Sequence, residues 1–95
     1  MSTVIHKHSF NLSDLTNQQK IQLPIGARFL SAVNQRGALC LYEQHDTKIT
    51  EIHDCYIHVI GTGHEHDLPT AAVFVGTVMF DGGELMLHIF SSEGV

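Results

Sequence analysis

The chain has 95 residues, a formal charge of −5 with its histidines neutral, and only 16% charged residues. This length accommodates one small hydrophobic core, so we expect a single domain over residues 1–95. Five basic residues against ten acidic ones argue against a nucleic-acid partner, because such binding needs a basic footprint. No apolar run approaches the roughly 18–20 residues of a membrane helix, and residues 1–10 lack the apolar core of a signal peptide. We therefore expect a cytoplasmic protein without a membrane partner, in which Cys40 and Cys55 are buried thiols.

Two features of the composition are unusual. Soluble domains have roughly 25% charged residues, and a small body with fewer charges leaves more apolar surface to cover, which favours a homo-oligomer. The chain also has eight histidines, whose full protonation would change the formal charge from −5 to +3. Histidine is the side chain that changes charge nearest to neutral pH without special tuning.

Alternation of apolar and polar residues at period two dominates the chain and predicts strands. The expected strands cover residues 4–10, 21–23, 28–35, 38–43, 48–60, 71–80 and 84–91. Residues 11–19 are expected to form a polar loop with room for one helical turn, residues 44–47 a turn, and residues 92–95 a tail. Hairpin turns are expected at Arg36-Gly37 and at Asp81-Gly82-Gly83.

About seven short strands and no convincing helix predict an all-β fold, a compact antiparallel sandwich or barrel. Gly76 interrupts the most apolar strand, which indicates a bulge, sharp coiling or a close backbone approach. His6 and His8 share one face of the first strand, which we interpret as a solvated face. His53 and His58 fall on opposite faces of one strand and cannot both line one site.

The segment Gly61-Thr62-Gly63-His64 follows a predicted strand and is the main candidate site. Glycines allow consecutive backbone N–H groups to point at an anion, while Thr62 adds a hydroxyl and His64 an imidazole. A phosphate or carboxylate would fit such a segment. The alternative is a tight glycine turn at a strand end, since the lysine and the helix of a Walker loop are both missing.

Three further residues complete the predicted ligand-binding set: Arg28, Thr77 and His88. Arg28 is a candidate for bidentate anion binding, with a surface salt bridge as the alternative. His88 lies on a strand with two largely apolar faces, so it is either a hydrogen-bonded core histidine or a ligand-facing residue. On this hypothesis the protein is not an enzyme, has no cofactor, and binds a small anionic ligand.

A metal-dependent enzyme is the second hypothesis, with His64, His66 and His88 as ligands. Three histidines and one open position suit catalytic zinc or iron. The His64-Glu65-His66 pair resembles the His-x-His pair that cupins carry on a small β-barrel, although the glycine-to-histidine spacing and the downstream glutamate of cupins are missing. A third hypothesis is an inhibitor that binds a host protein through an exposed sheet face or edge, without a small ligand.

A series of short motifs runs through residues 3–91 in a distinctive order: Pro24-Ile25-Gly26-Ala27, Gln35-x-Gly37, Leu39-Cys40-Leu41-Tyr42, Gly61-Thr62-Gly63-His64, Val75-Gly76-Thr77-Val78 and His88-Ile89-Phe90. In these motifs the chain resembles a family of small phage and prophage proteins of unknown function. It departs from them at Leu41-Tyr42 and Met86-Leu87, where that family has tryptophan, and in its Glu65-His66 pair.

The resemblance implies a phage accessory protein that acts in the cytoplasm of an infected bacterium. Small acidic all-β phage proteins of this kind are often early accessory or counter-defence factors, and one strategy among them is a homo-oligomer that sequesters a nucleotide immune signal. The resemblance assigns no catalytic residue, and fold-level analogy alone does not establish the activity.

Overall fold

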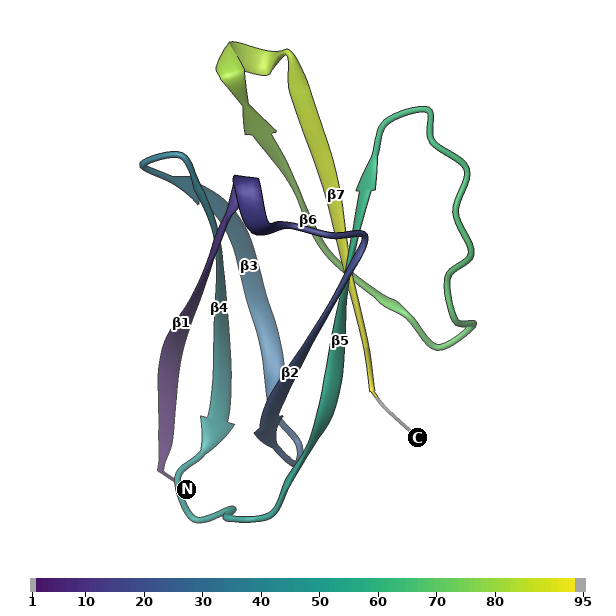
Figure 1. Cartoon of the computed structure of the whole chain (residues 1–95). Helices are drawn as coiled ribbons and strands as arrows, with labels where there is room; N and C mark the ends of the chain where they lie inside the picture. The colour runs from purple at the N-terminus through teal and green to yellow at the C-terminus, as the bar shows by residue number, and fades with distance from the viewer. Residues whose placement is uncertain (1, 94–95) are drawn as a thin grey trace.

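The computed structural model describes residues 2–93 as two antiparallel β-sheets packed against each other (Figure 1). One sheet has the strand order β1-β4-β3 and the other the order β2-β5-β7-β6. The elements are β1 (Thr3–Asn11), the 3-10 turn η1 (Leu12–Asp14), β2 (Gln18–Pro24), β3 (Arg28–Gln35), β4 (Ala38–Asp46), β5 (Ile52–Gly61), β6 (Val73–Phe80), the 3-10 turn η2 (Asp81–Gly83) and β7 (Leu85–Glu93). The predicted all-β fold of about seven strands is confirmed, with the sandwich as its form.

The helical turn expected within residues 11–19 is present as η1, and both predicted hairpin turns occur. Arg36 and Gly37 have φ values of 54° and 84°, and Asp81 has a φ of 52°. These left-handed conformations are those that tight hairpins require. No helix of the described residues is long and apolar enough to cross a membrane.

Several strand limits differ from the prediction. The predicted turn over residues 44–47 is wrong for residues 44–46, because β1 pairs with β4 as far as Thr3 opposite Asp46 and so places His45 in a strand. Strand β2 begins at Gln18, within the expected loop, since Gln18 pairs with His58. Strands β5 and β6 begin later than expected, at Ile52 and Val73.

The predicted tail of residues 92–95 is also wrong at its start. Strand β7 continues to Glu93, which pairs with Cys55 of β5. The rest of that tail, residues 94–95, lies outside the described residues.

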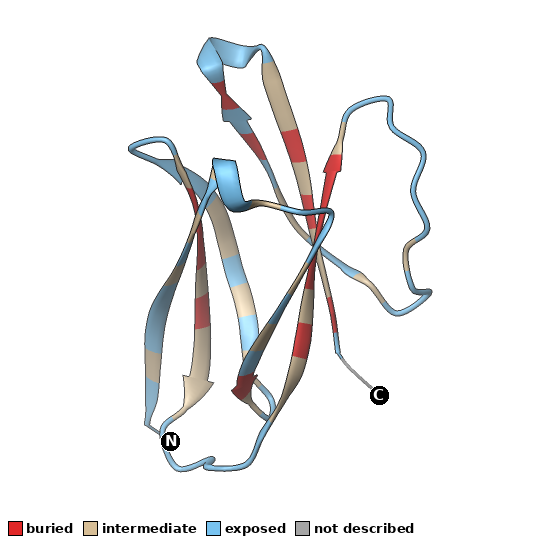
Figure 2. Cartoon of the chain, viewed as in Figure 1, coloured by how far each residue is buried: buried red, intermediate tan, exposed pale blue. Residues whose placement is uncertain are grey.

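The core lies between the sheets and draws on the strands inside them. Figure 2 shows buried residues concentrated on β4, β5 and β7, which have a neighbouring strand on each side. Because side chains alternate across a strand, every second residue of these strands faces the other sheet. The buried cluster consists of Leu39, Leu41, Ile57, Val59, Val78, Phe80, Leu87 and Ile89.

Gly76 forms the expected bulge and the expected close approach. The register of β6 against β7 shifts between Phe74 and Gly76. A Cβ atom at Gly76 would lie 3.5 Å from the Cβ of Ala32 in β3, which belongs to the other sheet. The Asn34 side chain of β3 also donates a 3.0 Å hydrogen bond to the Met79 carbonyl of β6. The bulge therefore lies where the two sheets meet along one side of the sandwich.

Candidate functional site

The glycine segment after β5 forms a tight turn that fixes His64. The backbone N–H of His64 donates to the Gly61 carbonyl at 3.2 Å, and Gly63 has a φ of 83° that favours glycine. A Cβ atom at Gly61 would lie 3.0 Å from Nδ1 of His64. The imidazole of His64 therefore packs against the Gly61 backbone, and a larger residue at this position would displace it.

His88 links two of the predicted ligand residues. Its Nε2 atom lies 2.7 Å from the Thr62 hydroxyl, and its Nδ1 atom lies 2.9 Å from the Thr77 hydroxyl. A neutral imidazole has one donor and one acceptor nitrogen, so one threonine donates to the ring and the other accepts from it. His88 is thus half-buried and hydrogen-bonded on both sides, and it orients the two hydroxyls.

A shallow hollow brings most of the predicted residues together. Its volume is about 250 Å³, and the rings of Phe74 and Phe90 meet edge to face in its wall with centroids 5.4 Å apart. We call it the β5–β7 hollow; its lining is Ile60, Gly61, Thr62, Gly63, His64, His66, Phe74, His88 and Phe90. Thr77 bonds to His88 but is not part of the lining.

Arg28 does not join this group. It lines a separate hollow of about 290 Å³ with Phe29 and Cys55 among its neighbours. The ion pairs within residues 2–93 all involve histidines, so the alternative of a surface salt bridge at Arg28 is not observed there either.

His64, His66 and His88, the alternative metal ligands, line this hollow together, but within residues 2–93 they do not form a group whose donor atoms all lie within 4.8 Å of one another. His66 Nδ1 lies 3.3 Å from the His64 carbonyl oxygen, to which it can donate. Both nitrogens of His88 already bond to threonine hydroxyls. Among the described residues, the group whose donor atoms all lie within 4.8 Å of one another is instead His6, Glu43 and His45.

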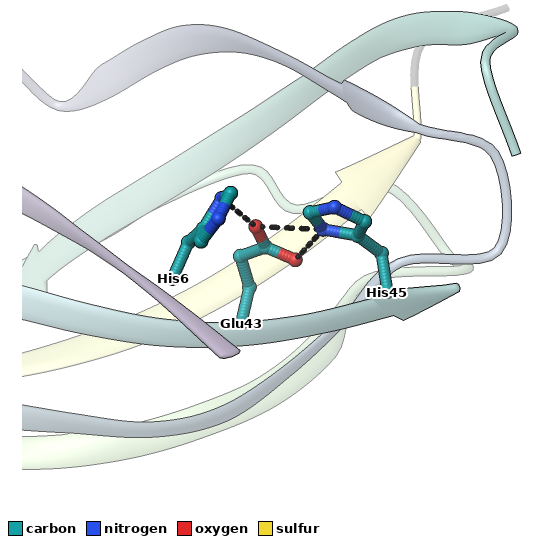
Figure 3. A group of neighbouring side chains, drawn as sticks. All are labelled: His6, Glu43 and His45. Carbon is teal, nitrogen blue, oxygen red and sulfur yellow. Dashed lines mark hydrogen bonds and ion pairs between the residues drawn. The ribbon is translucent and has the colours of Figure 1, made fainter. Parts of the chain in front are cut away.

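This second group surrounds a buried carboxylate. Glu43 is buried, and its oxygens lie 3.1 and 3.2 Å from Nδ1 of His45. Oε1 is also 3.2 Å from Nε2 of His8 and 3.8 Å from Nδ1 of His6. Figure 3 shows the imidazoles of His6 and His45 directed at the carboxylate from two sides. We call His6, His8, Glu43 and His45 the histidine cluster.

Strand register explains how the histidine cluster forms. His6 stands directly opposite Glu43 in the β1–β4 ladder, and His45 is two residues further along the same face of β4. That face continues the one that carries Leu39 and Leu41 in the core. The sequence interpretation of His6 and His8 as a solvated face missed this cluster. Each strand contains a same-face pair, His-x-His or Glu-x-His, but only the register joins them.

The two cysteines are buried thiols, as expected. The Cys55 sulfur lies 3.1 Å from Nε2 of His53, an arrangement that resembles a nucleophile and its base. Burial raises the pKa of the Cys55 thiol, and the nearby carboxylates of Glu93, Asp54 and Glu43 raise it further. A nucleophilic cysteine needs the opposite shift, so this pair does not form an activated nucleophile.

His58 lies on the other face of β5, as predicted. It is buried, and its Nε2 atom lies 2.8 Å from the Ser92 hydroxyl. Burial lowers the pKa of His58 because the charged imidazolium is poorly solvated there. His58 is therefore a neutral structural residue at neutral pH.

The chain belongs to the DUF7352 family, a domain of unknown function whose model matches residues 1–94. Neither the curated proteins nor the solved structures contain a significant match to the chain.

Proposed function

We propose that this member of the DUF7352 family is a non-enzymatic binding module for a small anionic, nucleotide-like ligand, which binds in the β5–β7 hollow. The observation that carries the proposal is the combination of polar and aromatic side chains in one place. Thr62, His64 and His88 line the hollow together with the rings of Phe74 and Phe90. A nucleotide needs both kinds of group, since its phosphate takes hydrogen bonds and its base stacks on aromatic faces.

The hydrogen bonds of His88 support the phosphate half of the proposal. In the tautomer that suits it, the Thr77 hydroxyl donates to Nδ1 of His88, and the Nε2–H group donates to the Thr62 oxygen. The Thr62 hydroxyl hydrogen is then left for an anion in the hollow. His64 and His66 are exposed beside it and add imidazole donors. His88 is thus a positioning residue for Thr62.

Phe74 supports the base half. It is 56% exposed, although a large aromatic side chain gains most when it is covered. Phe90 meets its ring at an interplanar angle of 65°, which holds the Phe74 ring in place. One face of Phe74 therefore remains for a planar ligand ring, where stacking contributes about 1–3 kcal/mol per base.

We also propose that the protein forms a homo-oligomer. Ile5 of β1, Ile52 of β5 and Val73 of β6 are each more than half exposed, and the charged fraction of the chain is low. Exposed apolar side chains favour association. The resemblance to phage proteins leads us to propose in addition that the ligand is a nucleotide defence signal, which the protein sequesters in the host cytoplasm.

Thermal unfolding with cyclic and linear nucleotides tests the ligand. A nucleotide at 100 times its Kd adds about 2.7 kcal/mol to the free energy of unfolding, and inorganic phosphate and free nucleosides serve as comparison ligands. Phe74→Ala is expected to weaken binding by about 1–3 kcal/mol. Met79→Ala is the matched control, because Met79 lies on the same strand with 54% exposure and outside the lining.

His64→Ala tests the anion contact and is expected to cost about 1.5–3 kcal/mol of binding free energy. A stable wild-type protein that no nucleotide stabilises would contradict the proposal and favour the inhibitor that binds a host protein. Equal losses in Phe74→Ala and Met79→Ala would remove the hollow as the site.

A further inference from the structure

The inward face at one end of the sandwich gathers a carboxylate and three imidazoles from two paired strands. Glu43 and His45 come from β4, the central strand of its sheet, and His6 and His8 from its neighbour β1. The geometry points to a binding site for a divalent transition-metal ion of the zinc type, held by His6, Glu43 and His45 (Figure 3).

The distances suit such an ion. Nδ1 of His45 lies 3.1 Å from Oε2 of Glu43, and Nδ1 of His6 lies 3.8 Å from Oε1. A tetrahedral ion with metal–ligand bonds of about 2.0–2.2 Å separates neighbouring donor atoms by roughly 3.3–3.6 Å. The two observed separations lie on either side of this range. The donor atoms of His6 and His45 also lie within 4.8 Å of each other, so the three donors are close enough for one ion to join them after modest side-chain rotations.

Paired strands supply the rigidity that a metal site needs. His6 and Glu43 are direct partners in the β1–β4 ladder, and His45 follows Glu43 on the same face. The His6 and His45 rings also meet edge to face, with centroids 5.0 Å apart. Ligands on regular strands hold their geometry better than ligands on loops.

The buried carboxylate of Glu43 favours a bound cation. The side chain of Glu43 is 1% exposed, and within residues 2–93 its ion-pair partners are histidines. A buried carboxylate without a compensating positive charge is strongly destabilising. A divalent ion supplies this charge and satisfies all three donor atoms at once.

The donor types select the class of metal. Two imidazoles and one carboxylate form the donor set of several catalytic zinc sites and of non-haem iron sites. Calcium and magnesium prefer ligand sets made of oxygen atoms, and copper(I) prefers thiolates and thioethers. The ring of His6 is 56% exposed, so a fourth position on that side is open to water.

His8 acts through Glu43. Its Nε2 atom lies 3.2 Å from Oε1 of Glu43, but it is outside the group whose donor atoms all lie within 4.8 Å of one another. A hydrogen bond from its ring to Oε1 orients the carboxylate, as partners outside the coordination sphere commonly do. His8 is therefore a positioning residue of the site.

Calorimetric titration of metal-free protein with Zn²⁺ and Co²⁺ tests the site. We expect one ion per chain and, for Co²⁺, the visible absorption of a four-coordinate complex. His6→Ala and His45→Ala are each expected to lower the affinity by on the order of 100-fold or more, and His8→Ala by about 10-fold. Millimolar Mg²⁺ or Ca²⁺ is not expected to compete.

His66→Ala is the matched control, because His66 is an exposed imidazole at the other end of β5 and is expected to leave the affinity unchanged. His6→Ala keeps the test decisive if His45→Ala fails to fold, since the His6 ring is largely exposed. The proposal is overturned if wild-type protein binds no stoichiometric ion. It is equally overturned if His66→Ala weakens binding while His6→Ala does not.

Discussion

The two ends of the sandwich interior share one face of β4 but have opposite chemistry. Toward one end, Leu39 and Leu41 of β4 pack with Ile57 and Val59 of β5 in an apolar cluster. Toward the other, the same face of β4 continues with Glu43 and His45. Apolar burial is non-directional and stabilises any close packing, whereas a buried carboxylate stabilises only with specific partners. The apolar end therefore stabilises the fold by packing alone, whereas the histidine end is stable only while Glu43 keeps its specific partners.

Truncation at the apolar end should break the fold most severely. Phe80 is 2% exposed and belongs to the core cluster, so Phe80→Ala is expected to lower the free energy of unfolding by about 3–5 kcal/mol. Urea denaturation followed by circular dichroism measures this loss. Met79→Ala, next to it but exposed, should change stability by no more than about 0.5 kcal/mol. Similar losses in the two variants would contradict the location of the core.

Neutralising the carboxylate at the histidine end should cost less stability and more binding. Glu43→Gln keeps the shape of the side chain but leaves buried polar groups with poorer partners, so we expect a loss of about 1–3 kcal/mol without metal. Zinc should stabilise the wild type and Phe80→Ala against urea, but not Glu43→Gln. A zinc effect that survives in Glu43→Gln would separate metal binding from the histidine cluster.

The smallest expected effect concerns pH and His58, which belongs to neither end of the interior. Burial lowers the pKa of His58 in the folded state, so the unfolded chain takes up a proton at a higher pH than the folded chain does. The stabilising effect of neutral His58 is therefore fully present above the ordinary histidine value of about 6.5 and decreases as the pH falls below it. His58→Gln should reduce the stability difference between pH 7.5 and pH 5.5, as measured by urea denaturation. An unchanged difference would contradict this account.

Much of the fold follows from local sequence patterns. Alternation at period two predicted the seven strands, and the turn residues at Arg36-Gly37 and Asp81-Gly82-Gly83 predicted both hairpins. Gly76 indicated the bulge in β6. These features depend on neighbouring residues, and a single sequence carries that information.

The candidate sites were predictable only where they are local. Thr62, Gly63 and His64 are consecutive and line one hollow with His88, whereas Arg28 lies elsewhere. The histidine cluster was missed because 37 positions separate His6 from Glu43 along the chain, and only the register of β1 against β4 brings them together. Register depends on both strands at once, so no pattern within one strand revealed it. The assignment of His45 to a turn concealed it further.

Strand β1 is paired on one side only, because it forms an edge of the sheet β1-β4-β3. His6 and His8 therefore lie on a strand with one hydrogen-bonded neighbour, while Glu43 and His45 lie on β4, which is protected on both sides. An ion bound across this pair of strands would act as a clip on the edge. Amide hydrogen exchange along β1 would slow when zinc is added. The exchange rate of this strand would therefore report whether the metal site is occupied.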